Sequence, residues 1–473
     1  MSYLSLIFLL AAVVACLLYQ ICPPARRSLF LLVASYAFYC TWSIKAAAAM
    51  AVVTILTFFA GRWTSDTESQ HRAHVAAAFT VVLLTGYLAF LKAAAVTAMP
   101  LVGHMALPIG VSYYTFKLIS YVMDTYSGKL QPERRFIPFA AYVAFFPQIL
   151  AGPIQRPGDF LKQAPPARTE VLEGAGRIVW GLAKKMLIAD QLAATVSYVF
   201  GHMQGLQGVA VLAGFYLYPL QLYADFSGLT DIAIGIGLLF GIRSPENFNR
   251  PFTASTITDF WRRWHMSLTS WLGDYVFVPL RMATRSLAKA GLVISIAVNT
   301  IAIGIWHGFT WNYFTFGAIH AVYLIAEALT SRQRARFFKK RPELDRAGTW
   351  LGRFYVFHMA AIAFVFFRAQ SMADAVWGLK HLWIGAGSLG AGMARLADAV
   401  DTQRLAMGLA GFGLVLLAEQ FRPDGWVKRM GSRLPFWTYR VVRAAVIMEL
   451  ALAMFLLVTS TGHAGQPFIY EGF

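Results

Sequence analysis

Apolar runs long enough to span or enter a lipid bilayer recur along almost the whole 473-residue chain. The hydrocarbon core of a bilayer is about 30 Å thick, so about 20 consecutive apolar residues cross it as one helix. Some runs are shorter than this or are interrupted by Gly and Pro. The runs lie near residues 3–22, 28–43, 45–61, 74–91, 106–123, 136–151, 175–200, 207–224, 228–241, 290–306, 309–329, 350–367, 405–420 and 437–459. The pattern predicts an all-α fold, a polytopic transmembrane helical bundle whose first helix is the N-terminal run.

The composition supports a membrane protein and argues against a nucleic-acid-binding protein. Hydrophobic residues make up 58% of the chain and charged residues only 14%, whereas soluble domains carry about 25% charged residues. The net charge of +18 comes from Lys and Arg in short loops between the apolar runs, as the positive-inside rule describes. We therefore expect membrane lipids as partners and no nucleic acid.

The densest basic cluster follows a long apolar run and predicts a cytoplasmic loop, because Lys and Arg are enriched in loops on that side of the membrane. Arg26 and Arg27 make the same prediction for the first loop, which would place the N-terminus on the outer side. The cluster consists of Arg332, Arg334, Arg336, Lys339, Lys340 and Arg341.

Gly and Pro interrupt several apolar runs, which predicts broken or re-entrant helices. Free backbone groups at membrane depth are tolerated only where protein or a water-filled cavity covers them, so these breaks favour a bundle with an internal cavity. No internal repeat is visible, which weakens a transporter built from two related halves and favours a single membrane-embedded domain over residues 1–473. The interruptions are at Pro147, Gly152-Pro153, Pro219, Gly228 and Gly235-Ile236-Gly237.

A polar motif beside the apolar runs marks the first candidate site, because an ionisable side chain costs about 2.5 kcal/mol or more in a bilayer and tends to be functional. If residues 259–271 form one helix, Asp259 lies one turn before the arginines and Arg262 lies one turn before His265. Such a patch suits phosphate, thioester or carbohydrate chemistry. The pattern fits an interfacial belt equally well, with Trp at the membrane surface and Arg at the headgroups. The motif contains Asp259, Trp261, Arg262, Arg263, Trp264 and His265.

A second histidine, His307, follows the apolar run from Ala297 to Ile305. An imidazole has an unperturbed pKa of about 6.5, which suits proton transfer near neutrality, and a low-dielectric site favours its neutral form. The alternative is a packing residue. His320 lies thirteen residues further on, about 20 Å along a continuous helix and on another face, so we expect it to serve helix packing or hydrogen bonding.

Two other kinds of chemistry find little support in the sequence. No Cys pair or His-Glu motif accompanies His265 and His307, and zinc takes three or four such ligands. No Gly-x-Ser-x-Gly elbow is present for a serine nucleophile. We therefore expect no metal and no bound cofactor.

Several motifs, spread in one order from the first third of the chain to its last residues, carry a family resemblance. The chain resembles the membrane-bound O-acyltransferase (MBOAT) family and, within it, the bacterial alginate O-acetyltransferase branch. The segments that match are Leu107-Pro108-Ile109-Gly110-Val111-Ser112-Tyr113-Tyr114-Thr115-Phe116, Phe145-Phe146-Pro147-Gln148-Ile149-Leu150-Ala151-Gly152-Pro153-Ile154, Asp225-Phe226-Ser227-Gly228, Pro245-Glu246-Asn247-Phe248-Asn249-Arg250-Pro251-Phe252, the segment from Asp259 to His265, Trp306-His307-Gly308, Phe366-Phe367-Arg368-Ala369 and Pro467-Phe468-Ile469-Tyr470.

The resemblance implies acyl transfer from a donor on the cytoplasmic side to a hydroxyl reached from the other side, through a central tunnel in the bundle. It assigns the catalytic histidine to His307 and a second functional histidine to His265. His307 would act as general base, and His265, with Arg262 or Arg263 nearby, would orient the donor or stabilise an oxyanion. The co-substrate would be acetyl-CoA or another activated acetyl donor.

The remaining site candidates are expected to bind substrate or to support the tunnel. For Asp225 and Asp259 we favour pairing with Arg residues that holds broken helices together, because an isolated buried charge is too costly. Asn247 and Asn249 are expected to stabilise a turn before Pro251. The candidates in this group are Arg262, Arg263, Trp264, Trp306, Asp225 and Asp259.

The expected function is an O-acetyltransferase of the bacterial inner membrane that modifies an exopolysaccharide of the alginate type. A periplasmic acetyl-accepting protein is the expected partner, and the polysaccharide is reached directly or through it. Two alternatives stay open. One is a D-alanyl transfer protein of the same family, and the other is a glycan or lipid transporter without acyl chemistry.

Overall fold

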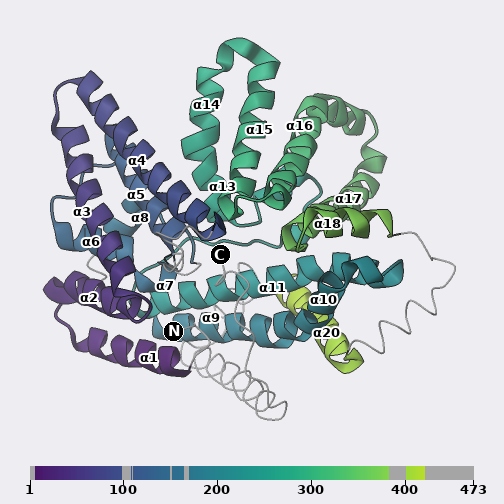
Figure 1. Cartoon of the computed structure of the whole chain (residues 1–473), viewed down its shortest axis with the longest axis horizontal. Helices are drawn as coiled ribbons and strands as arrows, with labels where there is room; N and C mark the ends of the chain where they lie inside the picture. The colour runs from purple at the N-terminus through teal and green to yellow at the C-terminus, as the bar shows by residue number, and fades with distance from the viewer. Residues whose placement is uncertain are drawn as a thin grey trace. The chain divides into compact units, whose positions relative to one another are not determined.

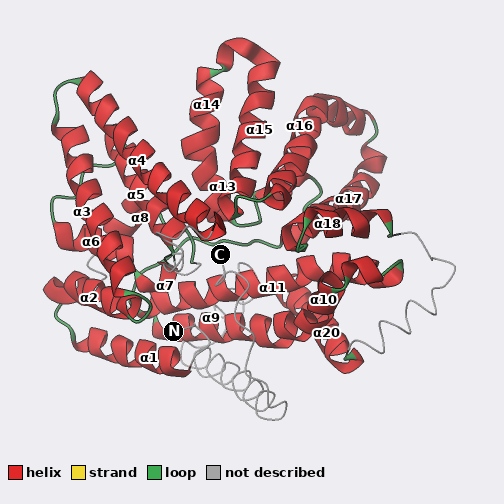
Figure 2. Cartoon of the chain, viewed as in Figure 1, coloured by secondary structure: helices red, strands yellow, loops and turns green. Residues whose placement is uncertain are grey.

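The described part of the chain consists of helices joined by loops, and no strand occurs in it (Figure 2). The structure is a computed structural model that describes residues 6–97, 108, 110–149, 152–163, 170–382 and 401–420. The apolar run near 437–459 and the Pro467 to Tyr470 motif lie outside these residues. The predicted all-α fold is therefore confirmed over the described residues.

Within the described residues, six helices are long and apolar enough to cross a membrane, which confirms a multi-pass membrane protein. Several other apolar runs form helices too short for this criterion, among them the predicted first span, which is a helix at Leu6–Ile21. The six candidate spans are Ile44–Asp66, Gln70–Ala94, Val209–Leu239, Arg285–His307, Trp311–Lys340 and Pro342–Arg368.

The chain divides into two compact units. The described part of the first unit lies within Met1–Gly181 and Leu229–Glu246, and that of the second within Leu182–Gly228 and Asn247–Gln466. One acyltransferase domain over residues 1–473 and a central tunnel both stay predictions.

In the first unit, the helices follow the apolar runs of the N-terminal third (Figure 1). Helices α3, α4 and α5 pack against one another, and α2 packs against α6. The helices are α1 (Leu6–Ile21), α2 (Arg27–Cys40), α3 (Ile44–Asp66), α4 (Gln70–Thr97), α5 (Val111–Tyr126), α6 (Phe136–Ala144), α7 (Phe146–Ile149), α8 (Pro157–Leu161) and most of α9 (Val171–Lys184), with the end of α11 (Val209–Leu239).

The predicted break near Pro147 is confirmed, because α6 ends at Ala144 and α7 is a four-residue turn. Polar side chains satisfy the backbone groups that the break leaves free. The Phe146 N–H donates to Ser35 Oγ at 3.1 Å, and the buried Lys117 Nζ donates to the Tyr142 carbonyl at 3.0 Å. Protein atoms thus cover this irregular backbone, as the membrane interior requires.

The breaks predicted at Pro219, Gly228 and Gly235-Ile236-Gly237 are wrong, because α11 runs unbroken for 31 residues through all of them. Gly235 serves close packing instead, since a Cβ there would lie 2.7 Å from the carbonyl oxygen of Gly174 on α9. The glycine allows α9 and α11 to approach and does not end the helix.

The second unit contains the rest of α11 and most of the chain after it. Helices α15 and α16 form an antiparallel hairpin, and α17 packs on α16 (Figure 1). The helices are α10 (Asp190–Gly201), α12 (Ile257–Trp261), α13 (Met266–Leu272), α14 (Val278–Ala283), α15 (Ala288–His307), α16 (Trp311–Lys340), α17 (Asp345–Arg368), α18 (Met372–Lys380) and α20 (Thr402–Gln420), with π-helical turns at Lys185–Ala189 and Gly273–Phe277.

Candidate active site

His307 is the last residue of α15, at the turn of the hairpin with α16. Thr310 caps the second helix, because its Oγ1 accepts a hydrogen bond from the Tyr313 N–H. A Cβ on Gly308 would lie 2.7 Å from the Tyr313 ring. The glycine of the Trp-His-Gly motif therefore lets the chain turn past Tyr313 and leaves the imidazole at the helix end.

Aromatic rings surround the imidazole of His307, and the residue as a whole is 9% exposed. The ring centroid of His307 lies 4.7 Å from that of Phe367, 4.6 Å from that of Trp306 and 6.1 Å from that of Tyr313. These aromatic contacts hold the imidazole at the end of α15, and an imidazole is the side chain most often used as a general base.

His265 lies in a turn between α12 and α13, so the prediction of one helix over residues 259–271 is wrong. Its backbone has a φ of +46°, in the left-handed region, which is uncommon for a residue with a side chain. Two backbone hydrogen bonds hold the turn against an earlier loop: Asn249 N–H donates to the Arg263 carbonyl, and Met266 N–H donates to the Asn247 carbonyl, both at 2.9 Å. This turn removes the helical register expected between Arg262 and His265.

The side chain of Asn247 positions His265. Its Oδ1 accepts from the Ser267 N–H at 3.1 Å and from Ser267 Oγ at 2.8 Å, which identifies this atom as the oxygen, and it lies 3.2 Å from His265 Nδ1. Since an amide oxygen only accepts, Nδ1 carries the proton. The predicted turn-stabilising role of Asn247 therefore missed its contact with the histidine.

The other nitrogen of His265, Nε2, presents an unused lone pair. Its residue is 1% exposed, and Nε2 has no hydrogen-bond partner among the described residues. Burial lowers the pKa of His265 to about 3, so the imidazole stays neutral near pH 7. In this tautomer Nε2 accepts hydrogen bonds, which disfavours the predicted oxyanion-stabilising role and favours holding a hydroxyl or thiol proton.

Trp306 joins the two histidines. Its ring centroid lies 6.0 Å from that of His265 and 4.6 Å from that of His307. Among the described residues, Trp264 makes no ring contact with either histidine, and its centroid lies 5.5 Å from that of Phe260 and 5.2 Å from that of Phe364. His265, Trp306 and His307 therefore form the candidate site, and Trp264 packs behind the turn that carries His265.

The arginines of the motif are not joined to His265 by any hydrogen bond within the described residues. Arg263 pairs with Asp259 at 2.9 Å, which agrees with the Asp–Arg pairing predicted for that carboxylate, and it also donates to Thr253 Oγ1 at 3.3 Å. Arg262 is exposed. These contacts support a structural role for Asp259 and Arg263.

These residues lie in a chain with clear relatives. A family model described as MBOAT, membrane-bound O-acyltransferase family, matches residues 134–368, which include both histidines. A probable alginate O-acetylase AlgI of Pseudomonas putida is 33% identical over 96% of this chain and 96% of its own. The chain belongs to the membrane-bound O-acyltransferase family. A peptidoglycan O-acetyltransferase of Helicobacter pylori is 28% identical over 76% of this chain and 74% of its own, and a teichoic acid D-alanyltransferase of Bacillus subtilis is 31% identical over 55% and 69%.

Asp225, another candidate residue of this O-acyltransferase, has a partner that the sequence did not predict. The buried Asp225 pairs with Lys185 at 2.8 Å, and Lys185 also lies 2.9 Å from Asp190. The predicted arginine partner is therefore wrong. A lysine was hard to foresee because Lys185 lies in a π-helical turn, whose register an α-helical pattern does not give.

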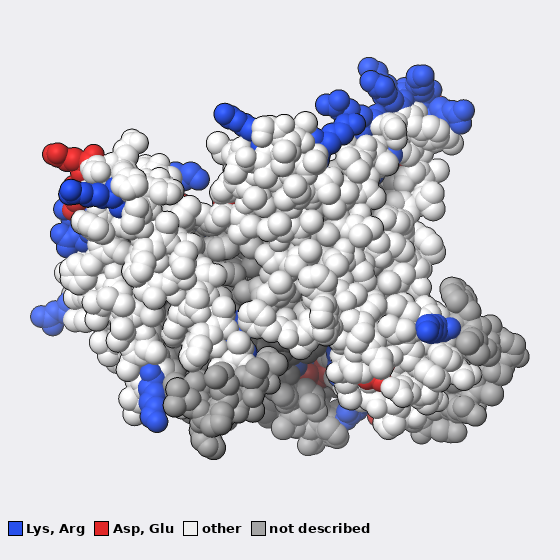
Figure 3. All heavy atoms as spheres, turned by 45° about the horizontal axis from the view of Figure 1, so that its top comes forward, with Lys and Arg blue, Asp and Glu red and all other residues white. Residues whose placement is uncertain are grey.

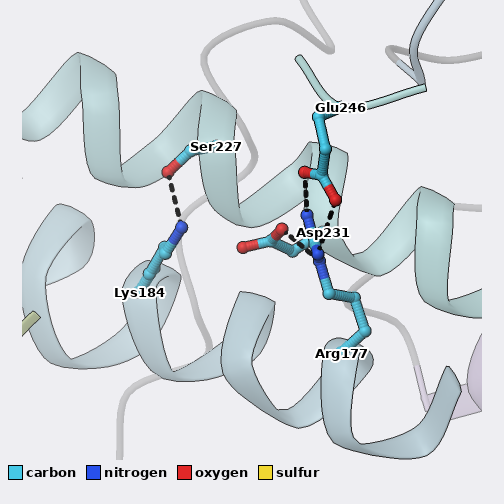
Figure 4. Close-up of polar contacts among 5 residues, drawn as sticks. All are labelled: Arg177, Lys184, Ser227, Asp231 and Glu246. Carbon is cyan, nitrogen blue, oxygen red and sulfur yellow. Dashed lines mark hydrogen bonds and ion pairs between the residues drawn. The ribbon is translucent and has the colours of Figure 1, made fainter. Parts of the chain in front are cut away.

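Other polar contacts link α9 to α11 and to Glu246, which follows α11, and none of the residues drawn is a histidine (Figure 4). In the first unit, Arg177 donates to Asp231 at 2.6 Å and forms a two-pronged ion pair with Glu246. In the second unit, Lys184 donates to Ser227 at 3.2 Å. The contacts to Asp231 and Ser227 join α9 to the antiparallel helix α11 and indicate structural support for this acyltransferase.

Two further residues of α16 support α12, which ends just before the turn with His265. Trp261 Nε1 donates to His320 Nδ1 at 3.3 Å, which confirms the hydrogen-bonding role expected for His320. Glu327 accepts from the backbone N–H groups of Ile257 and Thr258 at 2.7 and 2.9 Å. Sequence reasoning missed Glu327, because a helical pattern does not show that a carboxylate on one helix binds the N-terminal N–H groups of a helix far away in the sequence.

Proposed function

We propose that this O-acyltransferase transfers acetyl groups across the bacterial inner membrane for O-acetylation of an exopolysaccharide of the alginate type. The observation that carries the proposal is the site itself, in which His265 and His307 both make ring contacts with Trp306. The choice of acetyl and of an alginate-type polymer is supported by the similarity to the probable alginate O-acetylase along nearly the whole chain.

The chemistry follows from the two imidazoles. The acceptor hydroxyl lies with its proton toward a nitrogen lone pair of His307, and the His307 imidazole takes that proton as the oxygen attacks the acyl carbon. The new C–O bond gives a tetrahedral intermediate. It collapses by breaking the bond between the acyl carbon and its leaving group, which takes the proton from His307. The Nε2 lone pair of His265 accepts a hydrogen bond from a second hydroxyl of the acceptor and so orients the acceptor during these steps.

The co-substrate is acetyl-CoA or another activated acetyl donor on the cytoplasmic side. A periplasmic acetyl-accepting protein, or the polysaccharide itself, supplies the hydroxyl from the other side through the expected tunnel. Transfer through the bundle lets neither substrate cross the membrane. The acyltransferase family membership supports this chemistry over a glycan or lipid transporter.

The choice of acyl group is tested in membranes of a strain that lacks its own polymer acetylation and expresses this chain with the genes of the polymer. We expect isotope-labelled acetyl-CoA to give labelled acetate esters on the exopolysaccharide, measured by nuclear magnetic resonance after purification of the polymer. D-alanine esters on an anionic polymer, with no acetate, would instead favour the D-alanyl alternative, and the absence of any ester would favour a transporter.

Replacing Asn247 tests the positioning of His265. Asn247→Ala removes the acceptor of three buried hydrogen bonds, each worth about 1–3 kcal/mol when a buried group is left unpaired, so we expect transfer to fall by about tenfold or more. Asn247→Asp keeps the acceptors and adds a negative charge beside Nδ1, which stabilises the imidazolium. We expect Asp to restore part of the rate and to shift the acidic limb of the pH–rate profile to higher pH.

The pH profile separates positioning from folding. A merely structural Asn247 predicts that Asn247→Asp changes the amount of folded protein while the shape of the pH profile stays that of the wild type. Asn249→Ala is the matched control, because its side chain makes no hydrogen bond to His265 among the described residues.

A further inference from the structure

A large cavity lies in the second unit between α16, α17 and the first turns of α11. Its volume is about 1120 Å³, and its lining is mostly apolar. None of the residues that surround His265 or His307 belongs to the lining, so the cavity is separate from the candidate active site. We call it the α16–α17 groove, and its aromatic lining consists of Phe215, Tyr216, Phe338, Phe354 and Tyr355.

One end of the groove is strongly basic. Residues 331–349 contain seven Lys or Arg and two Asp or Glu, and Lys and Arg gather along one edge of the face in Figure 3. Arg334 lines the groove at this end and donates to the Glu327 carbonyl at 3.0 Å. A ligand at this end therefore meets a positive field.

The acidic residues of the groove are already engaged. Glu327 directs its carboxylate at the Ile257 and Thr258 N–H groups. Asp345 lies in the first turn of α17, where the helix dipole stabilises a negative charge. Neither carboxylate cancels the positive field of the basic end.

The groove also runs from a polar end into an apolar end. Along α17 it extends from Asp345 to Ile362, which is about 25 Å at 1.5 Å per residue. One leaflet of a bilayer contributes about 15 Å of hydrocarbon. A ligand that fills this groove needs a charged head and a long apolar tail.

We propose that the α16–α17 groove binds one anionic glycerophospholipid, with its phosphate beside Arg334 and an acyl chain along the aromatic lining. The positive charge at the basic end favours an anionic lipid over a zwitterionic one. The length of the apolar part of the groove favours a ligand with an acyl chain over a free phosphate. The bound lipid joins α16 to α17 at the end of the hairpin that is remote from His307.

The test is lipid binding to the purified full chain in detergent, measured by native mass spectrometry with dioleoyl-phosphatidylglycerol and dioleoyl-phosphatidylcholine. We expect the wild type to retain phosphatidylglycerol preferentially. Arg334→Gln should lower this preference about five-fold, the factor that corresponds to about 1 kcal/mol for one Lys or Arg at an anionic membrane surface. Arg336→Gln is the matched control, because Arg336 lies on the same helix and is absent from the lining.

Two more arms make the test decisive. Ala335→Trp places a large ring in the groove and should reduce retention of both lipids, with the transfer activity of the site unchanged. Glycerol 3-phosphate at millimolar concentration should not compete. Equal retention of the two lipids, a loss of preference in Arg336→Gln but not in Arg334→Gln, unchanged retention in Ala335→Trp, or competition by glycerol 3-phosphate would each overturn the proposal.

Discussion

Replacing His307 with alanine is expected to reduce acyl transfer by about 10²–10⁴-fold, the contribution of a positioned general base. The imidazole lies among aromatic rings at the turn of the α15–α16 hairpin, where Gly308 lets the chain pass Tyr313. Labelled acetyl-CoA and purified polymer, followed as acetate esters, give the measurement. His307→Phe should lose as much activity, because it fills the pocket but cannot accept a proton.

His320→Phe is the matched control for packing. His320 is as buried as His265 and also lies among aromatic rings, but its Nδ1 accepts from Trp261 and it has no proposed part in the reaction. We expect this variant to keep transfer within a few-fold of wild type once the amount of folded protein is matched. Retained acetylation in His307→Phe would contradict the general-base role and reopen the transporter alternative.

The fold could be predicted from the apolar runs because their length matches the bilayer. Helices α3, α4, α15 and α16 lie where the runs predicted them. Within the bundle the prediction failed at α11, because an apolar sequence with Pro and Gly looks the same in a broken helix and in a fully buried one. Whether a glycine breaks such a helix or allows close packing depends on the helix beside it. For Gly235 that helix is α9, whose Gly174 lies so close that a side chain at Gly235 would not fit.

The candidate site was predicted in part. Its residues could be selected by their type, but their geometry depends on a turn that the sequence pattern did not show. His265 and His307 were selected as histidines in apolar surroundings, and the structure brings both to Trp306. The left-handed conformation of His265 and its hydrogen bond with Asn247 were missed. Both depend on a loop eighteen residues earlier in the chain, and the local pattern of apolar and polar residues does not predict a contact at that distance.

Two adjacent lysines of the second unit hold the stretch of α11 that packs against His265. Lys185 pairs with Asp225, and Lys184 donates to Ser227. The residue between those two, Phe226, has its ring centroid 4.8 Å from that of His265, edge to face. The charge pair therefore fixes one wall of the pocket in which the Nε2 lone pair of His265 is presented.

Lys185→Met is accordingly expected to destabilise the protein by about 3–5 kcal/mol, because removing one partner of a buried ion pair leaves the opposite charge without its counterion. Asp225 and Asp190 would then face each other without the ammonium between them. The measurement is the free energy of unfolding in detergent, with Lys289→Met, at an exposed position, as the control.

The variant Lys185→Arg keeps the positive charge and should lose much less stability than Lys185→Met. Since the same pair holds Phe226 against His265, transfer per folded molecule should also fall in Lys185→Met. A stability within about 0.5 kcal/mol of wild type, the usual range for surface substitutions, would show that the pair does not hold this wall.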